Sequence, residues 1–349
     1  MKLHGRSYSQ RELEARVGSL EQIGGVRRFQ WTEGREAAAD MIEVRTGAGL
    51  RYLVSPSRGM DITLAEFGGV PLTWQSANRE AHPAYYDNRD IQWLRTAVGG
   101  LLMTCGLSYV GAPGEDTGEA FGLHGRAHHL PARHVAASGR WHNDEYDMTL
   151  SGLVEETRIF GENLRLTRTI RSRLGENRIH LLDVVENAGF SETPLMLLYH
   201  FNFGYPLLDE ATHISFPSQT VIPREPDVPL DGYDCWQPPD AAFAERVYYH
   251  EDMTADENGR LTATIHNPHF PLPGGKRPLT LQLSWFQSQL PKLVQWRMPG
   301  AGVHVLGIEP ANCTVAGRAA ARARGELELL PPGASRQFET EISITVGTH

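Results

Sequence analysis

Between residues 147 and 203 the chain is a close succession of β-type segments, and this run most constrains the fold. The segments are separated only by tight Gly, Asn or Pro breaks, and they cover 147–154, 156–160, 164–171, 178–187 and 193–203. The run contains no alternation of strands with helices, which a parallel sheet would need for its crossover connections. It therefore predicts an antiparallel, all-β architecture.

Residues 164–171 illustrate how these segments are patterned. Leu164, Leu166 and Ile170 share one face of the expected strand, and Arg168 interrupts that face. The other face carries polar residues, namely Arg165, Thr167, Thr169 and Arg171. Alternation with a period of two is typical of a strand that is buried on one side.

Further β-type runs flank this region and raise the expected strand count to that of a large β-sandwich. They cover 41–46, 51–55 and 60–65 on one side, and 261–266, 279–285, 293–297, 303–308, 326–330 and 337–346 on the other. The last two runs are predicted to form a hairpin across Leu330-Pro331-Pro332-Gly333, with apolar contacts from Phe338, Ile342 and Ile344. Near the start, Ser9-Gln10-Arg11-Glu12 has the form of a capping box and predicts a short helix over about 9–18.

We expect a single domain over residues 1–349. The chain shows no internal repeat of fixed period and no low-complexity linker. The segment 217–239 is rich in Pro and Asp, and we interpret it as a long ordered loop and not as a domain boundary. All-β domains of this size occur undivided, and they bury enough surface to fold without disulfides.

Composition narrows the class of function. The formal net charge is -9 and basic residues form no run of five, which disfavours a nucleic-acid partner. No apolar stretch approaches eighteen residues and the N-terminus lacks a signal-peptide core, so we expect a cytoplasmic protein without a membrane span. The three cysteines, Cys105, Cys235 and Cys313, form neither a disulfide framework nor a zinc motif.

Three motifs carry residues that could do chemistry. His124 lies between Gly122 and Gly125, where backbone can approach a ligand, although a histidine that caps a turn would look the same. His200 and Asn202 fall on the same face of an apolar strand and are either satisfied internally or directed into a cavity. Glu309 follows the apolar run 303–308 and precedes Pro310, a position that suits a pocket, a turn cap or an arginine partner.

Taken together, these motifs favour work on carbohydrates. One glutamate and two histidines in an acidic all-β protein provide an acid and a base near neutral pH. Four tryptophans could stack on sugar rings, although core packing is the ordinary role for most of them: Trp74, Trp93, Trp285 and Trp296.

The sequence resembles the galactose mutarotase (aldose 1-epimerase) superfamily, because its motifs occur in the same order and at similar separations. The resemblance rests on Leu123-His124-Gly125, on His200-Phe201-Asn202 and on Glu309-Pro310. Over roughly residues 20–345 the chain more closely resembles a bacterial aldose 1-epimerase-like branch of unassigned substrate. The motifs that carry this closer resemblance are Ser57-Arg58-Gly59-Met60-Asp61, Gly99-Gly100-Leu101-Leu102, Thr104-Cys105-Gly106-Leu107 and Leu123-His124-Gly125-Arg126. This resemblance implies a galactose mutarotase-like antiparallel β-supersandwich.

The resemblance also implies a mechanism and its residues. Glu309 would be the general base for the anomeric hydroxyl, and His200 the general acid for the ring oxygen. His124 would hydrogen-bond and polarise the same oxygens. The expected partner is a small-molecule aldose or a derivative, and no cofactor or metal is required.

The substrate contacts depart from the family pattern. The Asn-Arg-Ile run typical of galactose mutarotases is missing, and 96–111 occupies its place. The candidates for substrate binding are Arg126, Asn202, Arg58 and Asp252, of which Asp252 would replace the sugar-binding aspartate of the family. For Arg58 a structural ion pair with Asp61 is the competing interpretation.

Two other functions stay open. The histidines at 124, 128, 129 and 134 could belong to a metal-dependent sugar isomerase, but Gly125 and Pro131 oppose the helix that an HExxH-like site needs. A non-catalytic sugar-binding protein could use the same fold. A homodimer is a candidate assembly.

Overall fold

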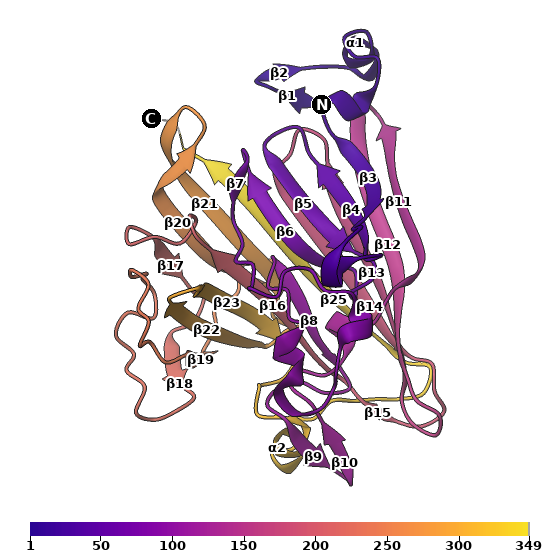
Figure 1. Ribbon diagram of the computed structural model, residues 1–349, viewed down its shortest axis with the longest axis vertical. Helices are drawn as coiled ribbons and strands as arrows, with labels where there is room; N and C mark the ends of the chain where they lie inside the picture. Colours follow the sequence, from indigo (N-terminus) through magenta and orange to yellow (C-terminus); the bar gives the residue numbers. More distant parts are fainter. Residues whose placement is uncertain (348–349) are drawn as a thin grey trace.

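The computed structural model describes residues 1–347 and consists mainly of antiparallel strands in three larger sheets (Figure 1). The largest sheet has eight strands, which include the whole central run of the sequence. In spatial order they are β11 (Arg133–His142), β12 (Glu145–Thr157), β13 (Asn163–Arg173), β14 (Arg178–Asn187), β25 (Ser335–Val346), β21 (Gly275–Phe286), β20 (Arg260–Leu272) and β17 (His213–Ser215).

A five-stranded sheet covers one face of the large sheet (Figure 1). Its apolar side chains and those of the large sheet form one continuous core, and Tyr52 hydrogen-bonds Ser172 across the interface at 2.9 Å. The two layers therefore make a β-sandwich, as the alternating pattern predicts. The strands of this sheet are β3 (Gly25–Gln30), β4 (Asp40–Arg45), β5 (Leu50–Ser55), β6 (Asp61–Phe67) and β7 (Val70–Pro71).

A six-stranded sheet carries the sites discussed below. One face contributes to the shared core, while the other packs against segments from 86–130 and 311–327 in a second apolar cluster. Its strands are β18 (Thr220–Pro223), β19 (Arg246–Glu251), β22 (Lys292–Gly300), β23 (Val303–Ala311), β16 (Met196–Gly204) and β8 (Leu102–Leu107).

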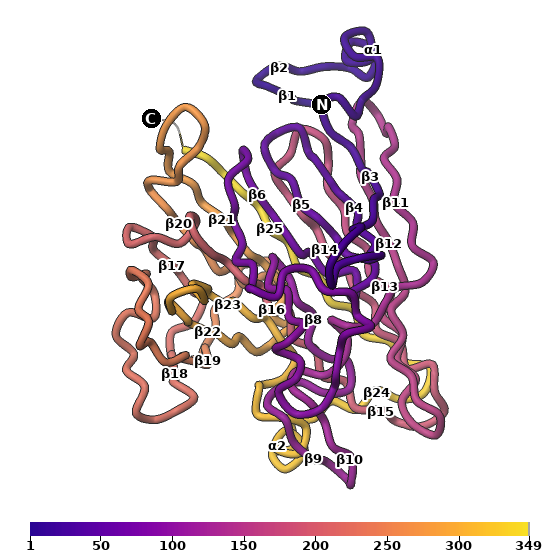
Figure 2. Tube along the Cα trace, in the orientation of Figure 1, coloured from indigo at the N-terminus to yellow at the C-terminus, as the bar shows by residue number. Residues whose placement is uncertain are grey.

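The remaining elements are short. Three two-stranded sheets pair β1 (Lys2–Leu3) with β2 (Arg6–Ser7), β9 (Gly114–Asp116) with β10 (Glu119–Phe121), and β15 (Thr193–Pro194) with β24 (Leu329–Leu330). The α-helices are α1 (Gln10–Glu14) and α2 (Arg318–Ala323). The 3₁₀ turns cover Leu20–Gln22, Gly34–Glu36, Pro83–Tyr85, Asp90–Arg95 and Ala127–His129. Figure 2 shows β9 and β10 beside α2, where Arg318 pairs with Asp116 at 2.7 Å.

The predicted N-terminal helix is confirmed but is shorter than expected. Ser9 caps it and exchanges hydrogen bonds with Glu12, as the capping box requires. The helix ends at Glu14, with Ala15 as its C-cap, and does not extend to about residue 18.

Two strand assignments in the sequence analysis are wrong. The expected C-terminal hairpin does not form, because β25 fills the gap between β14 and β21 while β24 pairs with β15 in another sheet. The segment Pro331-Pro332 crosses between the two sheets, and neither proline has an N–H group for a hairpin ladder. Residues 156–157 continue β12, and 158–162 form its turn into β13.

No helix within residues 1–347 is long and apolar enough to cross a membrane.

Candidate functional site

Pairing of β16 with β23 brings the predicted acid and base together. Leu198 lies opposite Ala311 and Phe201 opposite Ile308, so the register puts His200 opposite Glu309. His200 Nε2 lies 3.1 Å from Glu309 Oε1. This contact does not have the geometry of a hydrogen bond, and Oε1 is left without a hydrogen-bond partner among the described residues. The two groups are therefore close enough to exchange a proton after a small adjustment.

Gly307 makes room for this pair. A Cβ atom at position 307 would lie 2.5 Å from Glu309 Oε1 and 3.2 Å from His200 Cε1. The first distance is shorter than real Cβ contacts allow and the second is tighter than most of them, so a side chain at position 307 would force Glu309 to shift and crowd His200. This glycine belongs to the Gly307-Ile308-Glu309 motif, but its role could not be inferred from the sequence.

His124 lies close to the same pair. It lies in the loop after β10 with φ of 57°, next to Gly125, whose backbone packs against Gly106 of β8. Its ring centroid is 6.0 Å from that of His200 in an edge-to-face arrangement. The Nδ1 atoms of both histidines are buried and have no partner among residues 1–347. The three predicted catalytic residues therefore converge.

Aromatic rings surround the three polar groups. Trp296 packs edge-on against His200 at 5.5 Å between centroids, and Trp74 packs against Trp296 at 6.3 Å. Trp93 contacts His124 at 5.3 Å. Trp74 and Trp296 are partly exposed, so each offers a surface that a sugar ring could cover. Trp285, in contrast, is fully buried in the main core.

Burial controls the protonation of the site. It raises the pKa of Glu309 to about 8, helped by the nearby Glu245 and opposed by Arg224. It lowers the pKa of His200 to about 3, with a smaller contribution from His124. The pKa of His124 falls to about 4, through burial and then the charge of Arg224. At neutral pH the environment thus favours protonated Glu309 beside two neutral histidines.

Arg224 and Glu245 form the rim of the site, and the sequence analysis did not identify them. Arg224 pairs with Glu245 at 3.5 Å, and Glu245 accepts a hydrogen bond from Trp296 Nε1 at 3.0 Å. Arg224 follows β18 in the segment 217–239, which the sequence analysis described only as an ordered loop. No motif marks either residue, because only the pairing of β18, β19 and β22 brings them to the site.

Asn202 lies two residues after His200 on β16, so the two side chains project from the same face of the strand. Its Nδ2 atom donates to the carbonyl of His200 at 2.8 Å, whereas the buried Oδ1 has no partner among the described residues. The side chain therefore fixes the strand next to His200 and keeps one free acceptor.

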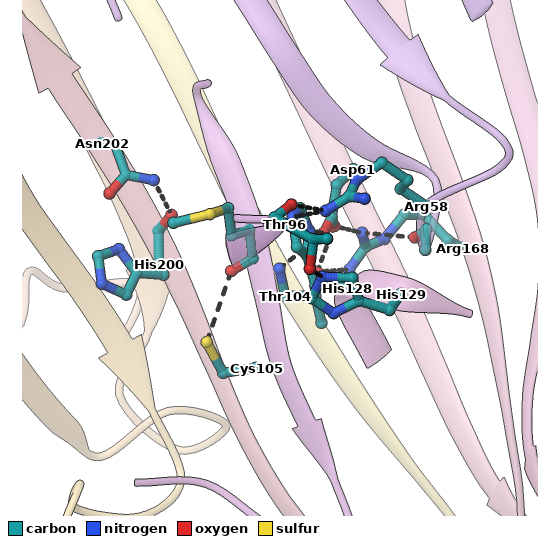
Figure 3. A network of polar contacts seen from close by, with 12 residues as sticks. Arg58, Asp61, Thr96, Thr104, Cys105, His128, His129, Arg168, His200 and Asn202 are labelled. Atoms are coloured by element: carbon teal, nitrogen blue, oxygen red, sulfur yellow. Dashed lines mark hydrogen bonds and ion pairs between the residues drawn. The ribbon is translucent and has the colours of Figure 1, made fainter. Parts of the chain in front are cut away.

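Arg58 lies away from these residues, in a buried network that Figure 3 shows on the other side of strand β8. Its side chain is fully buried, donates to the carbonyls of Ala81 and Thr96, and pairs with Glu80 at 3.6 Å. The predicted ion pair with Asp61 is absent. Instead, His128 lies between them, and it accepts from Arg58 through Nε2 at 2.8 Å and donates to Asp61 through Nδ1 at 2.6 Å.

Arg168 occupies the centre of this network. It contacts Asp61 at 2.6 Å and Asp183 at 2.7 Å, and all three side chains are fully buried. Tyr199, the neighbour of His200, donates its hydroxyl to Asp183 at 2.7 Å. The arginine that interrupts the apolar face of β13 is therefore matched by two carboxylates inside the core.

The two other substrate-binding candidates lie at the surface. Arg126 is exposed and lines a small cavity together with Glu156 and Tyr86. Asp252 is exposed at the end of β19 and accepts a hydrogen bond from Thr220 at 2.7 Å. No contact recorded within residues 1–347 joins either one to His124, His200 or Glu309.

Three of the four histidines of the metal alternative, His124, His128 and His129, pack around Trp93, but their ring nitrogens have different partners. His128 serves the buried network, His129 hydrogen-bonds Thr96 at 2.9 Å, and His134 is exposed on β11. Within the described chain, no three His, Cys, Asp or Glu side chains are grouped as metal ligands.

A large surface cavity of about 930 Å³ lies on a different part of the molecule. Polar residues on the outer face of the eight-stranded sheet line it, including Thr149, Arg171 and His180. Its lining includes neither the predicted catalytic residues nor a Trp, Tyr or Phe side chain. We therefore base the candidate site on the arrangement of side chains and not on cavity size.

Comparisons with known proteins agree with this description. A "putative aldose 1-epimerase" from Klebsiella pneumoniae is 25% identical, with a TM-score of 0.80 over 91% of this chain and 83% of that one. Two further structures share the fold. A galactose mutarotase-like protein from Clostridium acetobutylicum is 13% identical, with a TM-score of 0.61 over 93% of this chain and 100% of that one. A galactose 1-epimerase from Lactobacillus acidophilus is 12% identical, with a TM-score of 0.57 over 93% of this chain and 99% of that one. The comparison with curated protein sequences gives no significant match.

The fold is thus that of the galactose mutarotase-like proteins, as the sequence resemblance implies. The one family model that is matched covers residues 36–344, most of the chain, and its description is "Domain of unknown function (DUF4432)". The fold of the chain is similar to that of a putative aldose 1-epimerase, and the chain belongs to the DUF4432 family.

Proposed function

We propose that the protein is an aldose 1-epimerase-like isomerase that interconverts the anomers of a sugar. The observation that carries this proposal is the 3.1 Å contact between His200 Nε2 and Glu309 Oε1, with the ring of His124 packed against His200. An acid and a base at this separation can serve the two oxygen atoms bonded to one anomeric carbon.

The reaction needs two proton transfers and one bond cleavage. The carboxylate of Glu309 accepts the proton of the anomeric hydroxyl, and His200 donates its Nε2 proton to the ring oxygen. The bond between the anomeric carbon and the ring oxygen then breaks and gives the open-chain aldehyde. Rotation about the C1–C2 bond and the reverse transfers close the ring on the other face. His124 donates a hydrogen bond to the same oxygens.

The protonation of the buried pair fits this scheme if the two groups share one proton. With the pKa of Glu309 near 8 and that of His200 near 3, the pair holds a single proton over most of the range between these values, and burial favours its position on Glu309. Transfer across the 3.1 Å contact produces the reactive form, carboxylate and imidazolium. The apparent pKa values then belong to the pair and not to either residue.

The substrate would lie against Trp296, between the catalytic groups and the rim. Trp74 and Trp296 offer partly exposed ring faces, and Asn202 and the pair Arg224–Glu245 offer polar atoms for sugar hydroxyls. Carbohydrate sites combine these two features, since the apolar face of a sugar ring stacks and its edge hydrogen-bonds.

The test is the activity of Glu309→Gln and His200→Asn on a panel of freshly dissolved aldoses, followed by polarimetry or exchange NMR. Loss of a positioned general base or acid lowers the rate by about 10²–10⁴-fold, so both variants should approach the uncatalysed rate. Binding of the sugar should persist in Glu309→Gln, because the amide keeps the shape and can still hydrogen-bond.

Matched controls come from exposed positions. Glu257→Gln and His134→Asn make the same chemical changes on the surface and should leave the rate unchanged. Full activity in Glu309→Gln would refute the mechanism. A wild-type protein that binds an aldose but accelerates no anomer exchange would instead indicate a sugar-binding protein.

A further inference from the structure

A second cluster of unpartnered polar groups lies on the opposite face of the six-stranded sheet. Side chains alternate along β22, so Trp296 points to the candidate catalytic site and Arg297 to the other face. Arg297 is only 2% exposed. Its Nη2 donates to Gln237 at 2.9 Å, but Nε and Nη1 are buried without any partner among residues 1–347.

The cluster is electropositive. Arg246 of β19 lies opposite Arg297 in the register and therefore projects from the same face. Both guanidinium groups lie over the ring of Phe243, at 4.7 Å for Arg246 and 5.2 Å for Arg297. Within the described residues, neither arginine has a carboxylate within ion-pair distance. Two adjacent arginines without an acid are unusual in a chain whose formal net charge is -9.

His304 adds a further donor. It lies on β23 opposite Pro299, and Trp236 Nε1 donates to its Nε2 at 2.6 Å. Because an indole nitrogen can only donate, Nε2 must be the acceptor, and the ring proton of the neutral histidine is on Nδ1. This Nδ1 atom is buried and has no acceptor in the described part of the chain. Trp236 thus holds His304 as a donor, and its own ring lies 5.3 Å from the Arg297 guanidinium.

The carboxylates in the neighbourhood do not complete the cluster. Glu210 is exposed and acts on His304 only through its charge. Asp240 is exposed and accepts the N–H group of Ala242 at 2.9 Å. Burial of Arg297 costs hydration free energy. The cation–π contacts with Phe243 and Trp236 offset only part of this cost, because each contributes less than the desolvation of a charge costs.

We propose that Arg297, Arg246 and His304 bind one small inorganic anion. The anion would accept the free N–H groups of Arg297 and the Nδ1–H group of His304, and its charge would offset that of the two arginines. The rings of Trp236 and Phe243 flank the Arg297 guanidinium, so we expect an anion of the size of a halide or a simple oxyanion. The site lies on the face opposite Glu309, so its existence does not depend on the proposed isomerase activity.

Crystals of the wild-type protein soaked in sodium bromide locate the anion directly. We expect an anomalous peak within hydrogen-bonding distance of the Arg297 guanidinium, and sulfate soaks distinguish a halide site from an oxyanion site. Either anion at this position supports the proposal. A clear map with neither anion there, or with both arginines bonded only to protein and water, would overturn it.

Thermal unfolding provides the test in solution. Sodium chloride and sodium phosphate are compared with a bulky sulfonate buffer at equal ionic strength. A ligand present at about one hundred times its Kd raises the folding equilibrium constant about 100-fold, so a binding anion should raise the Tm of the wild type. Arg297→Met should lose this specific increase, and Arg246→Gln, at a partly exposed position, should weaken it.

Arg171→Gln is the matched control. Arg171 is exposed on the outer face of the large sheet and has no recorded ion pair within the described residues, so its removal changes the net charge equally but should leave the anion effect intact. Equal increases in all four proteins would mean a general salt effect and would contradict the proposal. Arg246→Gln keeps the test decisive if Arg297→Met does not fold.

Discussion

Strand β16 separates two buried polar regions that differ in how completely their atoms are paired. Tyr199 points into the network of Arg168, Asp61 and Asp183, where the carboxylates and the central arginine all have partners. His200, the next residue, points to the other side, where its Nδ1 and the Oε1 of Glu309 have none among residues 1–347. Both regions are buried.

We propose that this difference separates polar groups with a structural role from those of the proposed site. A buried charge that is fully paired adds order, whereas an unpaired buried group is costly and persists only if the fold enforces it. The same comparison separates Arg168, which is matched on two sides, from Arg297, which is not. Three predictions test the distinction, in order of expected effect.

Arg168→Met should produce the largest change. It leaves Asp61 and Asp183 buried beside each other without their cation, and breaking a buried pair in this way costs about 3–5 kcal/mol of unfolding free energy. Urea unfolding measures the loss. Glu309→Gln, in contrast, replaces a buried carboxyl group, whose pKa is raised to about 8, by an amide of the same shape and should cost little. Equal destabilisation of Arg168→Met and Glu309→Gln would contradict the proposed distinction between paired and unpaired buried groups.

Gly307→Ala should reduce activity far more than stability. The added methyl group would displace the Glu309 carboxylate and the His200 ring, and a misplacement of about 1 Å can lower a rate about 100-fold. Polarimetry and thermal unfolding on the same sample separate the two effects. Gly18→Ala is the control, because nothing lies within 4 Å of a Cβ atom there. Unchanged activity in Gly307→Ala would show that the close packing is not required.

The pH dependence of stability between pH 6.5 and 8 should show the smallest effect. The pKa of Glu309 is raised from 4.5 to about 8 by burial, so between these values the folded protein keeps a proton that the unfolded chain has lost. Stability must then fall as the pH rises through this window, by at most about 1.4 kcal/mol per pH unit.

The window from pH 6.5 to 8 isolates this contribution. His124 and His200 have pKa values lowered from 6.5, so the stability linked to them is present above pH 6.5 and is lost as the pH falls toward about 4 and 3. Unfolding of the wild type and Glu309→Gln at several pH values gives the difference. We expect the variant to gain stability relative to the wild type as the pH rises, and a constant difference would place the carboxylate in water.

Much of the sandwich could be predicted from local patterns. The alternation over 164–171 predicts which face of β13 is buried, and the apolar positions Phe338, Ile342 and Ile344 of β25 are indeed in the core. The expected C-terminal hairpin fails for a physical reason. Strand partners depend on which sheet edge is free, and short-range patterns do not contain that information. A single domain over the whole chain stays a prediction.

The sequence by itself determined most of the strands, the capping box and the three motifs that carry His124, His200 and Glu309, because these depend on side-chain periodicity and short spacings. Only the tertiary structure decided which charges meet. Arg58 pairs with Glu80 and not with Asp61, Arg224 and Glu245 reach the rim from distant segments, and Arg297 is left without an acid. Electrostatic partners are set by distances of a few ångströms between segments that are far apart in the chain, and strand pairing together with the course of the connecting loops fixes those distances.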